Sequence, residues 1–313
     1  MPVAIGTLFF ASACSGDAGT TTASSESDGL NIVTSTSIWG DVASAVVTDE
    51  KATVTPIITG NSIDPHHFDP SAADLAKATE ADIVVVGGGG YDAWLYDVVD
   101  EDKIVNALPL IAHDHGDHEG HDHGEEAHDE HEGHTDHEEH DHGPIEMIEG
   151  NEHIWYDTDA VEYVAEEIEA AATANTPGIE ADAQPVLDRM KEMDQLIEEL
   201  PAAKIVQSES VGDYIIDDSN MEDITPESYR KAILTETEPA ASDLAAFLDV
   251  LKGNEVDVLL FNPQTATDTA ERIKKAAEEN DVTIVEINET PEEGTNFLEY
   301  FEQRVQALSD AVK

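Results

Sequence analysis

The most constraining feature of this sequence is a repeated alternation of short apolar runs with longer segments of helical spacing. In the first part of the chain, residues 30–34, 53–59 and 83–86 are expected to form strands, with helices at 39–47 and 72–79 between them. Strands that alternate with helices form a largely parallel sheet, because each helix returns the chain to the same end of the sheet. The loops at the carboxyl ends of such strands are then available for binding.

The same alternation starts again after residue 201, beyond a long helical segment. The second part has expected strands at 204–207, 256–261 and 282–287 and expected helices at 240–252, 267–280 and 295–312. Between the two parts, a helix at 160–174 stops at the sequence Asn-Thr-Pro-Gly of residues 175–178. Apolar residues then recur at helical spacing over 182–200, namely Val186, Met190, Met193, Ile197 and Leu200.

These patterns predict an α/β protein of two similar lobes, each a mostly parallel sheet flanked by helices, joined by one long linker helix. The expected parts are an N-terminal lobe at 30–178, the linker helix at 179–200 and a C-terminal lobe at 201–313. A length of 313 residues with 40% apolar residues is enough for two hydrophobic cores. An ordinary core helix at 182–200 is the alternative, and length alone does not decide between them.

The charge balance excludes some classes of partner. The chain has 70 acidic and 14 basic residues, a formal net charge of −56, so nucleic acid and anionic lipid surfaces are repelled. Such a field attracts cations. It also resembles the acidic surfaces of proteins that work in high salt, and the sequence does not separate these two causes.

The first 29 residues have the pattern of a lipoprotein signal and tether. A mostly apolar stretch at 3–13 ends at Cys14, the only cysteine, and a polar stretch follows. We expect Cys14 to be lipidated, so that the protein is anchored outside the cytoplasm. The alternative is an ordinary secretory signal with an incidental cysteine. No apolar run reaches about 18 residues, so no membrane-spanning helix is expected.

Residues 113–142 form a histidine-rich, acidic segment. Eleven of the fourteen histidines lie there, with thirteen Asp and Glu: His113, His115, His118, His121, His123, His128, His131, His134, His137, His140 and His142. Clustered imidazoles bind Zn²⁺, Cu²⁺ or Ni²⁺ without a folded site, so a disordered insertion that collects metal is expected.

The other three histidines lie in two short motifs, and no histidine follows residue 153. Residues 64–70 read Asp-Pro-His-His-Phe-Asp-Pro, and residues 151–157 read Asn-Glu-His-Ile-Trp-Tyr-Asp. His67 is expected to face solvent or to support a metal ligand, and direct binding of the metal by His67 is the alternative. Asp69 and Asp157 could accept hydrogen bonds from ligand imidazoles, and Asp69 could instead cap a helix.

With the Asp-Pro-His motif, the Asn-Glu-His-Ile-Trp motif and the Asp-Ala-Trp-Leu of residues 92–95, the chain resembles the metal-specific solute-binding proteins of ABC importers, which take up zinc or manganese. The histidine-rich insertion resembles that of the zinc-specific members. The resemblance implies a receptor, not an enzyme, that holds one metal between two lobes. It also implies an ABC permease as partner, a position on the outer face of the membrane, and a monomer.

The resemblance also implies four metal ligands, one from each of four loops. Carried over by position, these are His66, His153, Glu209 and a residue after the last core strand, which is Asn288 or Glu289. We choose Glu289, because an anionic oxygen is the stronger ligand for a divalent cation. Two imidazoles and two carboxylates suit Zn²⁺, or Mn²⁺ if the carboxylates bind in bidentate fashion. The histidine-rich segment favours Zn²⁺.

Three other interpretations of the sequence exist. The sequence His-Asp-His-Gly-Asp-His at 113–118 matches a metallo-β-lactamase-like hydrolase motif, but the further histidines of that fold are missing downstream. A phosphate cradle at 87–90 is disfavoured, because Tyr91 and Asp92 follow the glycines instead of Lys and Ser or Thr. A cell-surface zinc buffer or chaperone that acts through 113–142 remains an alternative function.

Overall fold

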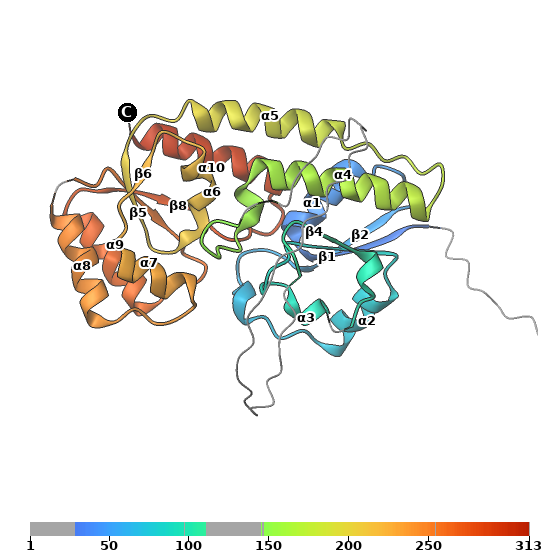
Figure 1. Ribbon diagram of the computed structural model, residues 1–313, viewed down its shortest axis with the longest axis horizontal. Coiled ribbons are helices and arrows are strands. Elements are labelled where there is room, and N and C mark those ends of the chain that lie inside the picture. The colour runs from blue at the N-terminus through green and yellow to red at the C-terminus, as the bar shows by residue number, and fades with distance from the viewer. Residues whose placement is uncertain (1–28, 97, 111–144, 146, 254, 313) are drawn as a thin grey trace, which may run out of the picture.

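The computed structural model describes residues 29–96, 98–110, 145, 147–253 and 255–312 (Figure 1). The expected signal and tether, with Cys14, and the histidine-rich segment at 113–142 lie outside the described residues. None of the helices in the described residues combines the length and the hydropathy of a membrane-spanning segment.

The first sheet of the described chain has four parallel strands in the order β2-β1-β3-β4. Its strands are β1 (Asn31–Thr36), β2 (Thr53–Ile58), β3 (Ile83–Val86) and β4 (Ile104–Asn106). The central strand β3 consists of four β-branched residues that are all buried, as expected for a parallel strand covered on both faces.

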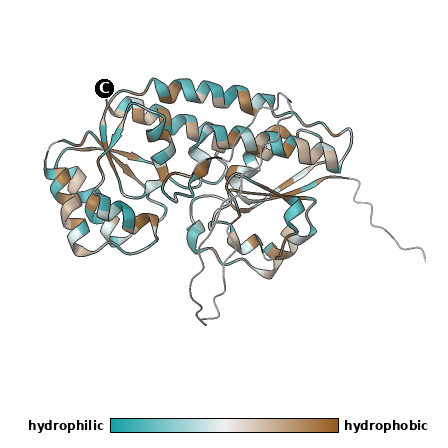
Figure 2. Cartoon of the chain, viewed as in Figure 1, coloured by the Kyte–Doolittle hydropathy of each residue, from teal (hydrophilic) through white to brown (hydrophobic). Residues whose placement is uncertain are grey.

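The second sheet of the described chain repeats this design, with four parallel strands in the order β6-β5-β7-β8. Its strands are β5 (Lys204–Gln207), β6 (Glu222–Asp223), β7 (Val258–Phe261) and β8 (Thr283–Glu286). Two separate parallel sheets confirm the predicted fold class. Figure 2 shows mostly hydrophobic strands at the centre of each lobe and helices in which hydrophilic and hydrophobic residues are mixed.

Helices flank both sheets. In the described residues they are α1 (Ser37–Val46), α2 (Ala72–Glu80), α3 (Ala93–Tyr96), α4 (Thr158–Asn175), α5 (Gln184–Glu198), α6 (Asp213–Asp217), α7 (Glu227–Leu234), α8 (Ala241–Lys252), α9 (Asp268–Glu279) and α10 (Phe297–Ala311). Most lie within two or three residues of a helix expected from sequence. The exceptions are α3, α6 and α7, which are short and lack a long apolar repeat.

Helix α5 lies along one side of the molecule across both lobes (Figure 1). Its buried residues Val186, Met190, Met193 and Ile197 form one stripe, which packs against α4, α1 and α10. The linker is therefore not an isolated spine. Since burying one such side chain contributes roughly 1.5–3 kcal/mol, the stripe holds the helix firmly on the lobes.

One hydrophobic core runs from the first lobe into the second. It joins Ile32 and Val85 of the first sheet to Ile205 and Leu260 of the second through buried residues of α4, α5 and α10. The C-terminal helix α10 contributes to this continuity, because it packs on both β8 and α1. The boundaries at 178 and 200 remain predictions, since the core does not stop at either.

Candidate metal centre

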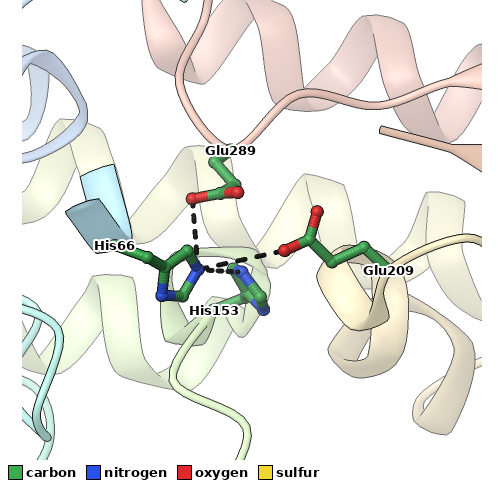
Figure 3. Close-up of side chains that lie close together, drawn as sticks. All are labelled: His66, His153, Glu209 and Glu289. Atoms are coloured by element: carbon green, nitrogen blue, oxygen red, sulfur yellow. Dashed lines mark hydrogen bonds and ion pairs between the residues drawn. The ribbon is translucent and has the colours of Figure 1, made fainter. Parts of the chain in front are cut away.

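Four of the residues expected to bind metal lie together between the two lobes (Figure 3). His66 lies in a short 3-10 turn (Pro65–His67) between β2 and α2, and His153 directly precedes another such turn (Ile154–Tyr156). Glu209 follows β5, and Glu289 follows β8. Each lobe thus supplies two side chains, each from a loop outside the sheet.

The donor atoms of these four side chains all lie within 4.8 Å of one another. His66 Nε2 is 3.3 Å from His153 Nε2, 3.4 Å from Glu289 Oε2 and 4.0 Å from Glu209 Oε1. A tetrahedral ion with bonds of about 2.0–2.1 Å has ligand atoms about 3.3 Å apart. The distances to His153 and Glu289 therefore match a Zn²⁺ site, while Glu209 lies slightly farther from His66.

The loop before α2 holds His66 by local hydrogen bonds. Asp64 accepts from the backbone N–H of His66 at 3.0 Å, and Pro65 occupies the first position of the turn. Ser71 and Asp74 form a capping box that starts α2 immediately afterwards. These contacts set the backbone of His66, while its ring is oriented by other residues.

The hydrogen bonds of His153 fix which ring nitrogen faces the cluster. The amide nitrogen of Asn151 donates to Ser210 O and to Asp213 Oδ2, both at 2.6 Å, so its oxygen Oδ1 faces His153. That oxygen lies 2.7 Å from His153 Nδ1, which must therefore carry the proton. The lone pair of Nε2 then points into the cluster, as metal binding requires.

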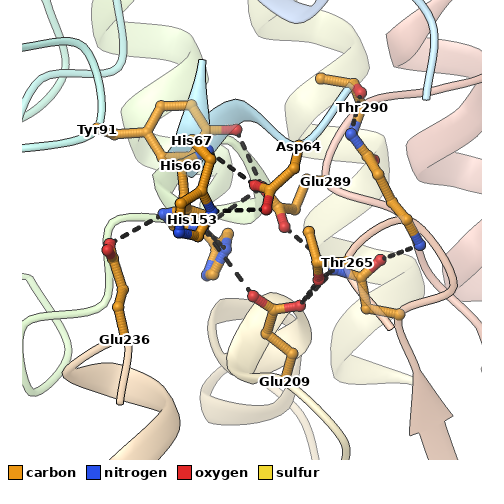
Figure 4. A network of polar contacts seen from close by, with 12 residues as sticks. Asp64, His66, His67, Tyr91, His153, Glu209, Glu236, Thr265, Glu289 and Thr290 are labelled. Carbon is orange, nitrogen blue, oxygen red and sulfur yellow. Dashed lines mark hydrogen bonds and ion pairs between the residues drawn. The ribbon is translucent and has the colours of Figure 1, made fainter. Parts of the chain in front are cut away.

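The two carboxylates share one supporting residue, Asn262. Its amide nitrogen lies 3.1 Å from Glu289 Oε1 and 2.5 Å from Glu209 Oε2. Tyr91 OH donates to Glu289 Oε2 at 3.1 Å, and Thr265 donates to Glu209 (Figure 4). Glu289 is fully buried, so these hydrogen bonds are what its carboxylate has in place of water.

The pKa values of His66, His153 and Glu289 are shifted, and the cause differs from one group to the next. Burial disfavours charge on His66, but the hydrogen bond to Glu236 and the charges of Glu289 and Glu209 outweigh it and raise the pKa of His66 from 6.5 to about 10. Burial lowers the pKa of His153, and the nearby charge of His66 lowers it further. Burial raises the pKa of Glu289 from 4.5 to about 8, although the charge of His66 opposes this. A metal ion that binds to the cluster would therefore displace protons from it.

The remaining residues expected at or near the site lie elsewhere. His67 is exposed, and its Nδ1 lies 2.7 Å from Asp64 Oδ2. Asp69 is exposed, and the residue that caps α2 is Ser71. Asp157 caps α4 by accepting from the backbone of Ala160. The ring nitrogens of the two clustered histidines have other partners, so the role of Asp69 and Asp157 as imidazole acceptors is not what the structure shows.

Between the two candidates for the fourth ligand, the structure brings Glu289 into the cluster. Asn288 uses its backbone instead: its oxygen accepts from Tyr156 OH, and its N–H donates to Tyr300 OH, both at 2.8 Å.

The glycines at 87–90 form no open anion site, because Asp92 accepts from Gly87 N and Glu152 from Gly90 N. Gly88 has a positive φ, and a side chain there would collide with Leu108 O.

Glu236, which was not among the residues predicted from sequence, approaches the cluster from the second lobe. Its carboxylate lies 3.1 Å from His66 Nδ1, on the far side of the ring from the cluster. Two cavities, of about 380 and 340 Å³, flank the segment that carries it, and both reach His66, Glu209 and Glu236. The sequence around Glu236, Thr-Glu-Thr-Glu-Pro, contains no motif that distinguishes it from other acidic segments of the chain.

Comparison with known proteins decides the family. Residues 32–311 match the family described as "Zinc-uptake complex component A periplasmic", also named ZnuA. The chain belongs to this family. Its description is that of a periplasmic component of a metal-uptake system, in agreement with the resemblance noted in the sequence.

Individual relatives differ in the metal they are named for. Zinc-binding lipoprotein AdcA of Streptococcus pneumoniae is 24% identical over 275 residues, which are 80% of this chain and 50% of AdcA. Manganese-binding lipoprotein MntA of Halalkalibacterium halodurans is 36% identical over 103 residues, which are 30% of this chain and 33% of MntA. The matches thus span half or less of the length of these relatives.

Solved structures share the fold. The crystal structure of ZnuA has a TM-score of 0.61 and 17% identity, covering 91% of this chain and 100% of its own. The protein FpvC of Pseudomonas aeruginosa, in complex with Mn²⁺, has a TM-score of 0.60 and 17% identity, covering 91% and 98%. At this identity the likeness establishes the two-lobed α/β architecture of this family member.

Proposed function

We propose that this protein is an extracytoplasmic receptor that captures one Zn²⁺ between its lobes and delivers it to an ABC permease for import. The observation that carries the proposal is the convergence of His66, His153, Glu209 and Glu289, whose donor atoms lie within 4.8 Å of one another. Four loops from two lobes meet there, so binding and the relative position of the lobes are linked.

The donor set supports a divalent cation. Two neutral imidazoles and two ionised carboxylates give a near-neutral site once a divalent ion is bound, and the distances of 3.3 and 3.4 Å from His66 Nε2 to His153 and Glu289 match a tetrahedral site. Burial of Glu289 and His153 limits competition by water. The strongly negative field of the whole chain would draw cations toward the site.

Contacts between the lobes suggest how the occupied state could be recognised. Tyr91 of the first lobe donates to Glu289 of the second, Gln264 donates to Ile63 O at 2.6 Å, and Thr290 donates to Gly60 O at 2.9 Å. A ligand that pulls Glu289 and His66 together tightens this same interface. The permease would then distinguish the loaded surface from the empty one.

Further parts of the proposal come from sequence. We propose that Cys14 anchors the protein to the outer face of the membrane, that it acts as a monomer without enzymatic activity, and that residues 113–142 raise the local concentration of zinc. Membership of an uptake family supports transport over hydrolysis. Mn²⁺ is the alternative cargo, because relatives named for each metal match this chain.

Calorimetric titration tests the proposal. The protein without residues 1–29 and 113–142 is titrated with Zn²⁺ and with Mn²⁺, beside the protein that retains 113–142. One tight Zn²⁺ equivalent in both forms, lost in His66→Ala and His153→Ala, is expected. Tighter Mn²⁺ binding would reassign the cargo. Loss of all tight binding with 113–142 would instead favour the surface buffer.

A further inference from the structure

The segment that follows α7 places a carboxylate from the second lobe against a histidine of the first. Glu236 Oε1 lies 3.1 Å from His66 Nδ1, while His66 Nε2 faces His153, Glu289 and Glu209 (Figure 4). Glu236 therefore lies on the opposite side of the imidazole from the metal-binding cluster. A carboxylate in this position accepts the Nδ1 proton, orients the ring and makes Nε2 a stronger donor to metal.

The backbone conformation of Glu236 does not favour a glutamate, so the end of helix α7 does not explain why this side chain is present. Thr237 N donates to Ala232 O and Glu236 N to Ile233 O, the two hydrogen bonds of a Schellman ending for α7. Glu236 occupies the left-handed position of that ending, with φ of 51°. Glycine is the usual residue at this position, and a residue with a side chain adopts it less readily.

The helix that presents Glu236 is itself tied to the other histidine. Arg230 of α7 makes two hydrogen bonds to Asp213, at 2.7 and 2.8 Å. Asp213 accepts from Asn151, and Asn151 Oδ1 accepts from His153 Nδ1. Helix α7 and the residues that end it thus contact the outer ring nitrogen of His66 directly, through Glu236, and that of His153 indirectly, through Asp213 and Asn151.

We propose that Glu236 is a positioning residue that orients His66 for metal binding across the lobe interface, with α7 as its anchored support. The inference rests on the proposed metal-binding function. It assigns Glu236 no bond to the metal, because its carboxylate faces Nδ1 and the cluster faces Nε2.

Three variants of the full-length protein test this role. Glu236→Gly removes the side chain and suits the left-handed backbone, whereas Glu236→Gln keeps a hydrogen-bond acceptor without the charge. The matched control is Glu238→Gln, which removes a charge two residues away, where the carboxylate accepts from Thr269 instead of an imidazole. Zn²⁺ affinity is measured against a competing chelator, and the visible spectrum of bound Co²⁺ reports the ligand geometry.

The expected result separates positioning from folding. Glu236→Gly lowers the Zn²⁺ affinity about 10- to 100-fold and alters the Co²⁺ spectrum, while its metal-free melting temperature is no lower than that of the wild type. The Zn²⁺ affinity of Glu236→Gln lies between those of Glu236→Gly and the wild type. The affinity of Glu238→Gln stays within about twofold of the wild type, because its carboxylate contacts no metal-binding imidazole. Equal affinities for Glu236→Gly and Glu238→Gln would overturn the proposal, as would a loss of affinity matched by a lower melting temperature. Absence of tight Zn²⁺ binding in the wild type would refute the proposed function itself.

Discussion

Replacing Glu289 by glutamine should make the metal-free protein more stable while it removes tight metal binding. Glu289 is fully buried, and burial raises its pKa from 4.5 to about 8. Between these two values the folded state holds a proton that the unfolded state has released. Stability therefore falls as pH rises through this window, because the unfolded state binds fewer protons there.

The magnitude follows from the two pKa values. Each pH unit above 4.5 lowers the unfolding free energy of the wild type by about 1.4 kcal/mol, until the carboxyl group of the folded protein ionises near pH 8. Glutamine has no such ionisation, so Glu289→Gln should gain up to about 2 kcal/mol at pH 6 and up to about 4 kcal/mol at pH 8 by the same relation. Loss of the carboxylate charge beside His66 offsets part of this gain. The amide can keep both neighbours, with its oxygen toward Asn262 and its nitrogen toward Tyr91 OH.

Urea unfolding at pH 6 and pH 8, with a chelator present, measures this difference. Glu292→Gln is the control, since it removes one charge from an exposed position of the same loop and should change stability little at either pH. The reasoning is refuted if Glu289→Gln is no more stable than the wild type at pH 8, or if its advantage does not grow between pH 6 and pH 8.

Three further predictions follow from the same geometry. Zn²⁺ affinity should rise with pH between pH 6 and pH 8, by about tenfold per pH unit for each proton displaced, because the raised pKa values of His66 and Glu289 keep protons on the metal-free cluster over this range. A flat affinity profile would contradict this prediction. Tyr91→Phe removes the hydrogen bond to Glu289 and should weaken Zn²⁺ binding about 2- to 10-fold in a chelator competition, whereas an unchanged affinity would mean that the hydroxyl does not hold the carboxylate. Asp157→Ala should lower the unfolding free energy by about 1 kcal/mol through loss of the α4 cap, without changing Zn²⁺ affinity. A loss of affinity without a loss of stability would mean that Asp157 supports a metal-binding imidazole after all.

The strands and long helices could be predicted because local patterns encode them. The run at 83–86 is four β-branched residues, and the structure has β3 at Ile83–Val86. Helix α5 was visible in the repeat from Val186 to Ile197, because one buried stripe recurs every three or four residues. Helix α7 was not predicted, because only Tyr229 among its eight residues is buried and its sequence has no repeating apolar stripe.

The site divides in the same way. Sequence by itself determined the α/β class, the two histidine motifs and the types of side chain available to a metal, since these depend on neighbours along the chain. Only the tertiary structure decided that Glu289 rather than Asn288 enters the cluster, and that Asp157 caps a helix. It alone brought Glu236 to His66 across 170 residues of sequence. The spacing of residues along the chain does not predict such contacts. They form only when loops from two separate sheets come together over one continuous core.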